Sequence, residues 1–264
     1  MLKVKNISKT FNPGTVNEKT ALWDLSLHLE QGDFVTILGS NGAGKSTLFN
    51  AIAGSFVGDT GSIQLDGKDI TNLPDYKRSK VIGRMFQDPL RGTAPNMTIE
   101  ENLALAYMRA SHHTSPFSMI NKRDRAEFRD RLAQLELGLE DRMDHPVGLL
   151  SGGQRQALTL LMATLVTPKL LLLDEHTAAL DPATAEKVLE LTEKIVAENN
   201  ITCLMITHNI PSALALGNRT IMMKNGSIVM ELSGEERATM TSEKLLQKFH
   251  EQGMSNDRIL FSAE

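Results

Sequence analysis

Hydrophobic and polar positions alternate along the first thirty residues of the chain, and their spacing then changes. Apolar residues at Leu2, Val4 and Ile7 and, with a period of two, at Leu25, Leu27 and Leu29 predict antiparallel strands with one buried face. Residues 34–38 are continuously apolar, which predicts a strand covered on both faces. A helix is predicted from Gly44, because the apolar side chains that follow it recur at helical spacing.

The middle of the chain, from about residue 97 to residue 150, has a helical pattern instead. Thr98 and Glu101 have the spacing of a capping box, and residues 122–137 predict a charged amphipathic helix. Residues 111–116 predict a loop, and its two adjacent histidines have no further ligand at metal spacing. This part of the chain is therefore expected to form a helical insertion.

Beyond Ser151, helices alternate with buried strands again, and Asp181 followed by Pro182 marks the start of one helix. The dipeptide Asn225–Gly226 predicts a hairpin turn. Further strands are predicted over residues 62–67, 81–86, 170–173, 202–206, 219–223 and 227–230. Further helices are predicted over residues 151–166, 182–198 and 241–252.

This order of elements predicts an α/β fold, a single domain over residues 1–264 that contains an antiparallel β subdomain. The expected parts are a core over about residues 1–95 and 151–232, a helical subdomain over about 96–150, and a C-terminal helical tail over about 233–264.

Composition narrows the range of partners. A net charge of −4 gives no reason to expect nucleic acid or an anionic membrane surface as a partner. The apolar stretches are far shorter than the roughly 20 residues that span a bilayer, so we expect a soluble, cytoplasmic protein. Cys203 is the single cysteine and is expected to be a buried strand residue.

Residues 39–47 carry the first chemical motif, between a buried strand and a helix, which is the context of a phosphate-binding loop. Its glycines let backbone N–H groups converge on phosphate oxygens, and the helix N-terminus adds partial positive charge. Lys45 is expected to reach the β- and γ-phosphates of a nucleotide, and the Ser46 hydroxyl to bind Mg²⁺. The predicted phosphate-binding residues are Gly39, Ser40, Asn41, Gly42, Ala43, Gly44, Lys45, Ser46 and Thr47.

A pair of carboxylates follows the apolar strand at residues 170–173. Ligands of open parallel sheets bind at the carboxyl ends of the strands, where Asp174 and Glu175 are expected to lie. Asp174 is the expected Mg²⁺ ligand, acting through water. Glu175 is the candidate general base, because it is placed to polarise the attacking water.

Leu150–Gln154, with the sequence Leu-Ser-Gly-Gly-Gln, places a serine and two glycines before a helix, which by itself fits a plain N-cap. Together with the two other motifs, it resembles the signature of the nucleotide-binding subunits of ATP-binding cassette (ABC) transporters, over about residues 2–232. The resemblance implies a P-loop NTPase core of the ABC type, in which Ser151 and Gly153 contact the γ-phosphate of an ATP held by the opposite subunit. The signature residues assigned to this contact are Ser151, Gly152, Gly153 and Gln154.

Four further residues match family positions individually. Gln87 matches the glutamine that senses Mg²⁺ and the attacking water and couples the site to the permease. Asp181 lies in the segment that matches the loop across the dimer interface, and His208 matches the histidine that contacts the γ-phosphate. Phe11 matches the aromatic residue that stacks on adenine, although burial in the core is an alternative for it.

The sequence departs from the family pattern in two places. His176 stands where the family usually has proline after the glutamate, and many relatives carry an arginine near Met162 that is missing here. His176 either contacts the facing subunit or nucleotide or is simply tolerated in a loop, and we favour tolerance. Neither departure removes a group that hydrolysis needs.

The resemblance implies an ATPase subunit that works as a homodimer with ATP and Mg²⁺ and energises import of a small solute. The implied partners are transmembrane permease subunits and, indirectly, an extracellular solute-binding protein, with the ATPase at the cytoplasmic face of the membrane. Permeases of the branched-chain amino-acid type are the favoured mates, and an amino acid is a hypothesis for the cargo. The alternatives are an efflux system and a non-transport ABC ATPase, which usually carries a long coiled-coil insertion or a second cassette.

Overall fold

The computed structural model describes residues 1–110 and 121–251, so the predicted loop at 111–116 with its two histidines lies outside the described residues. The chain forms two compact units. The first unit consists of Met1–Arg78 and Asn200–Glu264, and the second of Ser79–Asn199. The predicted helical subdomain, about residues 96–150, falls within the second unit.

One sheet of the first unit is antiparallel, as the alternating pattern predicts, with strand order β2-β1-β4-β5. Leu2, Val4 and Ile7 are buried on one face of it. Its strands are β1 (Leu2–Phe11), β2 (Lys19–Leu29), β4 (Thr60–Leu65) and β5 (Lys68–Asp69).

The other strands of this unit run in the order β10-β9-β3-β8, and β3 (Phe34–Leu38) is parallel to both of its neighbours. Every residue of β3 is buried, which explains its continuous apolar run, and Cys203 in β8 is buried as predicted. Asn225 and Gly226 form the predicted turn between β9 and β10. The remaining strands are β8 (Thr202–Ile206), β9 (Arg219–Lys224) and β10 (Ser227–Ser233).

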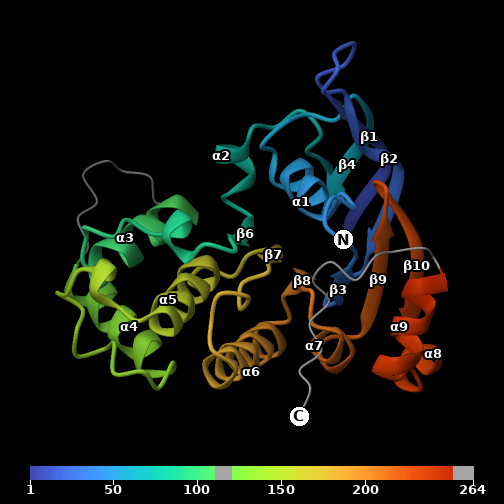
Figure 1. Cartoon of the computed structure of the whole chain (residues 1–264). Helices are drawn as coiled ribbons and strands as arrows, with labels where there is room; N and C mark the ends of the chain where they lie inside the picture. Colours follow the sequence, from blue (N-terminus) through green and yellow to red (C-terminus); the bar gives the residue numbers. More distant parts are fainter. Residues whose placement is uncertain (111–120, 252–264) are drawn as a thin grey trace. The chain divides into compact units, whose positions relative to one another are not determined.

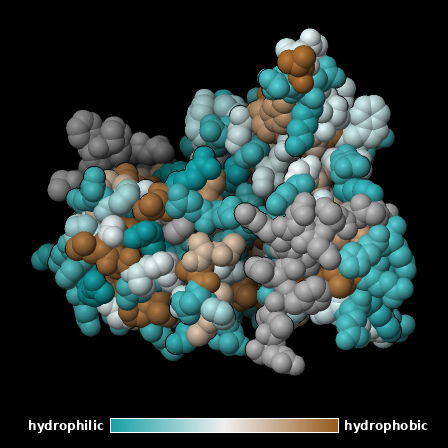
Figure 2. Space-filling view, in the orientation of Figure 1, coloured by the Kyte–Doolittle hydropathy of each residue, from teal (hydrophilic) through white to brown (hydrophobic). Residues whose placement is uncertain are grey.

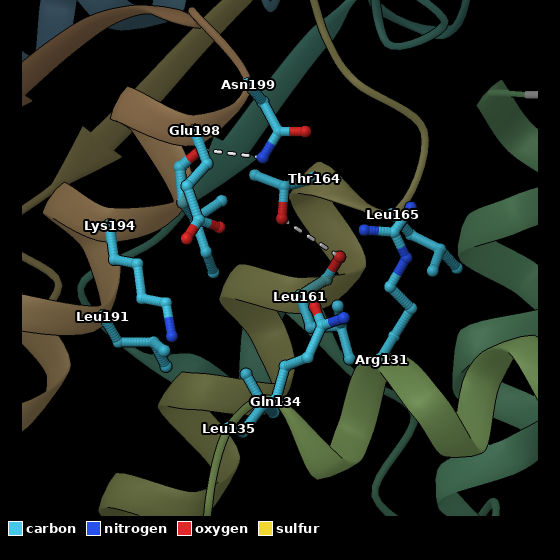
Figure 3. A pocket seen from close by; sticks show the side chains of 11 residues that line it. Arg131, Gln134, Leu135, Leu161, Thr164, Leu165, Leu191, Lys194, Glu198 and Asn199 are labelled. Atoms are coloured by element: carbon cyan, nitrogen blue, oxygen red, sulfur yellow. Dashed lines mark hydrogen bonds between the residues drawn. The ribbon is translucent and has the colours of Figure 1, made fainter.

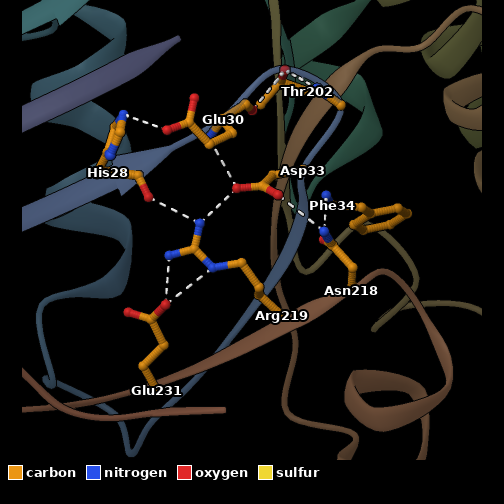
Figure 4. A network of polar contacts seen from close by, with 9 residues as sticks. His28, Glu30, Asp33, Phe34, Thr202, Asn218, Arg219 and Glu231 are labelled. Atoms are coloured by element: carbon orange, nitrogen blue, oxygen red, sulfur yellow. Dashed lines mark hydrogen bonds and ion pairs between the residues drawn. The ribbon is translucent and has the colours of Figure 1, made fainter. Parts of the chain in front are cut away.

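An ionic network fixes the amino end of β3 (Figure 4). The Arg219 guanidinium lies 2.6 Å from Asp33 Oδ2 and 2.6 Å from Glu231 Oε1, and Asn218 donates to Asp33 Oδ1. Burial raises the pKa of Asp33, but the hydrogen bonds from Asn218 and Glu30 and the charge of Arg219 outweigh it, so the pKa lies below its ordinary value. These contacts anchor the strand whose other end leads into the phosphate loop.

The helices of the first unit are α1 (Lys45–Ala53), α2 (Asp75–Arg78), α7 (Ile210–Ala215), α8 (Gly234–Ala238) and α9 (Ser242–Glu251). The Arg78 guanidinium is fully buried and donates to the carbonyl oxygens of Ala51 and Ile52, at 2.8 Å each. Because positive charge at a helix C-terminus complements the helix dipole, Arg78 stabilises the end of α1.

The second unit contains two parallel strands and a group of helices (Figure 1). The helices pack around a hydrophobic core of their own. Leu103, Phe128, Leu132 and Leu158 belong to this core and are fully buried or nearly so. The elements are β6 (Ile82–Met85), β7 (Leu170–Asp174), the 3₁₀ turns η1 (Pro89–Gly92) and η2 (Val147–Leu149), and helices α3 (Ile99–Ala110), α4 (Lys122–Ala133), α5 (Gly152–Thr164) and α6 (Pro182–Glu198).

The helix start signals in this unit are confirmed. Glu101 accepts from the Thr98 N–H at 2.7 Å, and the Thr98 hydroxyl accepts from the Glu101 N–H at 3.2 Å, which is the predicted capping box. Asp181 is the N-cap of α6, with Pro182 at the first helical position. Both signals are local, so the sequence carries them in full.

Several predicted boundaries are wrong by a few residues. The helix predicted over 122–137 ends at Ala133, because Glu136 takes a left-handed backbone conformation with φ 56°. The strand predicted over 81–86 is shorter at both ends, and the helix predicted to Val166 ends at Thr164. The short helices α2 and α7 are not predicted, since each is too short to show a period, whereas α8 lies within the predicted C-terminal helical tail.

None of the helices within residues 1–110 and 121–251 has the length and apolar character that crossing a bilayer requires.

Candidate nucleotide site

The phosphate loop connects β3 to α1, and at two of its glycines there is no room for a side chain. A Cβ on Gly39 would lie 2.5 Å from the Met223 carbonyl oxygen. Gly44 has φ 101°, and a Cβ there would lie 2.6 Å from the Ala21 carbonyl oxygen. Gly44 is also the N-cap of α1. Because glycine has no side chain, it provides no side-chain acceptor for the backbone N–H groups in the first turn of α1.

Hydrogen bonds within the first unit hold this loop in shape. The Ala43 N–H donates to the Ser40 carbonyl at 3.1 Å, and the Ala43 carbonyl accepts from the Gly226 N–H at 2.9 Å. Lys45 is only 5% exposed, and its ammonium donates to the carbonyl oxygens of Gly39 at 2.7 Å and Ser40 at 3.2 Å. The cation therefore lies inside the ring of the loop, while Ser46 is exposed.

His208 lies at the same edge of the sheet as the phosphate loop. β3 and β8 are parallel, with Ile37 opposite Ile206, and the Thr207 N–H donates to the Ile37 carbonyl at 3.2 Å. The loop after β3 and the residues after β8 therefore leave the sheet side by side. This places His208 at the edge of the sheet that carries the phosphate loop.

Phe11 is at the end of β1 and 36% exposed, so the alternative that it is a core residue is wrong. Its ring meets Phe56 edge to face, with 5.5 Å between the centroids. The Lys9 ammonium lies 5.8 Å from the Phe11 centroid and 5.7 Å from that of Phe56. The exposed ring offers a flat apolar surface, and Phe56 limits how it turns.

In the second unit, Gln87, Asp174 and Glu175 lie at one edge of the strand pair. β6 and β7 are parallel, with Met85 opposite Leu173, so both strands end at this edge. Gln87 is exposed, whereas the two carboxylates are half-buried. The predicted grouping of these three residues is therefore present within one unit.

Arg84 adds a positive charge to this edge that the sequence analysis missed. Burial lowers the pKa of its guanidinium, and the charge of Asp174 raises it in part. The guanidinium of Arg84 lies 4.5 Å from the Phe86 centroid and that of Arg91 lies 5.5 Å from it. Two guanidinium groups thus lie close to the ring of Phe86, the residue before Gln87.

Glu175 has a left-handed backbone, with φ 47°. Non-glycine residues rarely take this conformation, and where they do it is frequently at a functional site. The Glu175 carbonyl accepts from the Ala178 N–H at 3.0 Å, so the chain turns directly after the strand.

His176 departs from both sequence-based interpretations. It is 3% exposed, and its Nε2 lies 3.2 Å from Thr192 Oγ1 of α6, so it is neither at the surface nor merely tolerated in a loop. Burial lowers the pKa of its imidazole to about 4, which keeps the ring neutral near pH 7. The burial of His176 and its contact with Thr192 could not be predicted from the sequence, because loop residues show no periodic pattern.

The signature begins α5 with a complete capping box. Ser151 Oγ accepts from the Gln154 N–H at 3.2 Å, and Gln154 Oε1 accepts from the Ser151 N–H at 3.2 Å. The N-cap that the residues alone predict is confirmed. A hydroxyl that accepts one hydrogen bond still has its own proton to donate, and Ser151 and Gly152 are exposed.

Gly153 has a packing role in addition to the predicted ligand contact. A Cβ at this position would overlap the Thr184 methyl group, so α5 and α6 approach each other closely here. Ser151 and Gly153 border a cavity of about 560 Å³, together with Thr184 and Lys187 of α6. Of the signature residues, Ser151, Gly153 and Gln154 border this space, and Gly153 is itself buried.

Another cavity, of about 350 Å³, lies between α4 and the C-terminal parts of α5 and α6 (Figure 3). Arg131, Lys194 and Glu198 line it above apolar side chains such as Leu161. None of the predicted site residues lines it.

Asp181 is exposed and accepts from the Thr184 N–H at 3.1 Å as the N-cap of α6. Hydrogen bonds from Thr184 lower the pKa of this carboxyl below its ordinary value. The carboxylate is therefore ionised near neutral pH and available to a neighbouring chain.

These residues fit a nucleoside triphosphate with Mg²⁺. The uncapped first turn of α1 and the ammonium of Lys45 suit phosphate oxygens. The hydroxyl of Ser46, the amide of Gln87 and the carboxylate of Asp174 are hard oxygen donors, which Mg²⁺ prefers.

The sequence matches known proteins along most of its length. The family described as ABC transporter matches residues 22–178. A tyrosine transport ATP-binding protein of Clostridioides difficile strain R20291 is 47% identical over 250 residues, covering 94% of this chain and 98% of that protein. An aliphatic sulfonates import ATP-binding protein, SsuB 2 of Agrobacterium fabrum strain C58, is 35% identical over 245 residues, covering 89% of this chain and 86% of that protein.

Solved structures agree with this assignment. The dimeric post-hydrolysis state of the ATP-binding cassette MJ0796, bound to ADP and Pi, has a TM-score of 0.76 at 32% identity and covers 88% of this chain and 98% of its own. The ADP conformation of the cassette MJ1267 has a TM-score of 0.76 at 28% identity and covers 95% and 98%. The chain thus belongs to the ABC transporter family, as an ATP-hydrolysing nucleotide-binding subunit of the importer type.

Proposed function

We propose that this chain energises import of an amino acid through separate permease subunits, by hydrolysing ATP between two copies of itself. The observation that carries the proposal is a pair of helix N-termini with the chemistry to bind phosphate, one on each unit. The first is α1, which lacks a side-chain cap behind the phosphate loop, and the second is α5, which begins behind exposed signature residues. Helix N-termini favour phosphate oxygens, so two copies can enclose each triphosphate from two sides.

The residues divide the work on the nucleotide as follows. The phosphate loop and Lys45 bind the triphosphate, and Ser46, Gln87 and Asp174 hold Mg²⁺. Glu175 accepts the proton of the attacking water, and His208 donates to the γ-phosphate. Phe11 stacks on adenine, an interaction supported by its exposed ring.

The partner copy supplies the remaining contacts. Ser151 donates its hydroxyl proton to the γ-phosphate, and Gly152, Gly153 and Gln154 form the helix end around it. Asp181 crosses the interface between the two copies. The dimeric state of the similar MJ0796 structures supports this assembly.

The permease is expected to dock on the second unit, which keeps the ATPase at the cytoplasmic face of the membrane. Leu90 of η1 and Leu105 and Met108 of α3 are exposed although apolar. Figure 2 shows brown patches over the region of α3 to α5. An amphipathic helix of a permease would cover such side chains. The permease would receive the solute from an extracellular binding protein.

An amino-acid cargo is supported by the name of the Clostridioides difficile relative, a tyrosine transport protein. Import is supported by the names of several relatives, including the sulfonate import protein. Reconstituting the chain with the permease and a binding protein tests this part directly. ATP-dependent accumulation of an amino acid inside vesicles is expected, and substrate-stimulated efflux would contradict it.

The Glu175→Gln variant tests the hydrolytic assembly. It is expected to bind ATP and Mg²⁺ but not to hydrolyse the nucleotide, so that ligand binding holds the dimer closed. Gel filtration with ATP and Mg²⁺ should shift from a monomer to a dimer position. A monomeric profile for an ATP-bound variant would refute the enclosed nucleotide.

A further inference from the structure

The imidazole of His176 joins the turn after β7 to the middle of α6. Its Nε2 lies 3.2 Å from Thr192 Oγ1, and Thr192 is fully buried while His176 is 3% exposed. The Thr192 hydroxyl in turn lies 2.7 Å from the Val188 carbonyl oxygen, one helical turn earlier. Three groups thus form a short chain of hydrogen bonds inside the second unit.

The direction of these bonds follows from the donors available. A threonine hydroxyl has one proton, and a carbonyl oxygen can only accept, so Thr192 donates to Val188. Towards His176 the hydroxyl oxygen can then only accept. The imidazole therefore carries its proton on Nε2 and donates it to Thr192, which orients the ring about α6.

The residue directly before His176 is Glu175, whose backbone is strained. A left-handed non-glycine backbone, here with φ 47°, persists only where neighbouring contacts over-determine it. The turn from Glu175 to Asp181 is attached to α6 at both of its ends. Asp181 caps the first turn of the helix, and His176 binds the helix two turns further along.

Burial limits what His176 can do in the reaction. With 3% of its surface exposed and its Nε2 proton engaged, the ring has no access to a nucleotide or to a water outside the core. It can act only through the backbone to which it belongs. That backbone carries the carboxylate of Glu175 one residue earlier.

We infer that His176 is a positioning residue for hydrolysis: its hydrogen bond to Thr192 holds the turn after β7 so that the Glu175 carboxylate faces the attacking water. The inference rests on the proposed role of Glu175. The imidazole fills a buried space and supplies one directional bond, and both are needed to keep the left-handed backbone. The phosphate loop and Lys45, which bind the triphosphate in the proposed function, belong to the other unit, so we expect ATP affinity to be retained when the bond is removed.

Paired variants separate the effect of the hydrogen bond between His176 and Thr192 from the effect of side-chain volume. His176→Met fills the space without a donor, whereas His176→Gln keeps an N–H at a similar reach. Thr192→Val removes the acceptor at nearly constant volume, whereas Thr192→Ser keeps it. His176→Met and Thr192→Val are each expected to lower kcat by about tenfold with KM for ATP within about twofold, while the Gln and Ser variants retain more than about half of kcat.

The double variant His176→Met/Thr192→Val tests whether the two residues act as one unit. Its kcat is expected to equal that of the worse single variant, since the second change removes nothing that is left. Independent effects, roughly a hundredfold loss, would overturn the pairing. Thermal unfolding and ATP affinity are measured on every variant, so that kcat is compared among folded, nucleotide-binding proteins.

The remaining outcomes are distinct. If His176→Met binds ATP and keeps the parent kcat while Glu175→Gln is inactive, the inference fails and the role of Glu175 stands. If Glu175→Gln itself keeps turnover, the proposed general base fails instead. Should His176→Met not fold, the Thr192→Val and Thr192→Ser pair decides, and equal kcat in both would overturn the inference.

Discussion

The N-termini of α1 and α5, to which the proposed function assigns the phosphates, are built in opposite ways. Gly44, the N-cap of α1, supplies no side-chain cap, and the main chain of the loop before it wraps around the Lys45 ammonium. α5 begins at Ser151, and Ser151 and Gln154 satisfy each other's backbone N–H groups. The N-terminus of α1 has no side-chain cap, whereas that of α5 has a complete capping box.

This difference suggests a division of labour. α1 combines the positive end of its helix dipole with the ammonium of Lys45, so we expect it to bind the triphosphate by itself. The end of α5 offers one hydroxyl proton and the helix dipole, a contact of modest strength. The signature is therefore suited to complete a site that already holds its nucleotide.

Charge changes at the two helix ends should have the largest and most distinct effects. Lys45→Ala is expected to weaken ATP binding by roughly 10- to 100-fold, since a charge-assisted bond to phosphate is lost. Ser151→Arg is expected to leave ATP affinity of the monomer unchanged and to reduce turnover by roughly 100-fold or more. Nucleotide titration and steady-state hydrolysis measure both quantities, and unchanged affinity in Lys45→Ala would refute its assignment.

Adding a methyl group to each motif should separate backbone strain from side-chain crowding. Gly44→Ala combines a φ of 101° with a contact to the Ala21 carbonyl oxygen, and we expect a loss of about 2 kcal/mol or more in unfolding free energy. Gly153→Ala meets only the Thr184 methyl group, at a cost of about 1–3 kcal/mol from overpacking.

The second-site change Thr184→Ser distinguishes these two causes. It removes the methyl group that crowds position 153 and keeps the backbone N–H that Asp181 accepts from. Thermal unfolding should show recovery of Gly153→Ala by Thr184→Ser. Persistent destabilisation would contradict crowding by the Thr184 methyl group as the cause.

Smaller changes at Ser151 should separate its cap from its contact with phosphate. Ser151→Ala removes the cap and is expected to destabilise the fold by about 1 kcal/mol. Ser151→Asp retains the cap but places a negative charge against phosphate, so stability should stay native while turnover falls. Equal turnover in Ser151→Asp and the parent protein would show that this end does not meet phosphate.

Local signals made much of this architecture predictable. Asp181 with Pro182, the pair Thr98 and Glu101, and Asn225–Gly226 fix their own backbone by contacts within a few residues. The phosphate loop is likewise a continuous segment. Sequence reasoning therefore located these elements closely.

Other features depend on contacts between distant residues and were missed. The bond of His176 to Thr192 spans 16 residues, and the left-handed backbone of Glu175 carries no sequence signal because the residue is not glycine. Arg84 interacts with Asp174 only because two parallel strands end together. The periodicity and spacing of residues in the sequence do not indicate such long-range contacts.

Mixing two inactive variants tests the shared site most directly. Lys45→Ala spoils a chain's phosphate loop and Ser151→Arg spoils its signature, so each homodimer has two defective sites. A mixed dimer has one site in which an intact loop meets an intact signature. Random pairing places half of the chains in such dimers, so an equal mixture should regain about a quarter of parent turnover. Activity no higher than the average of the two separate variants would contradict a site shared between two copies.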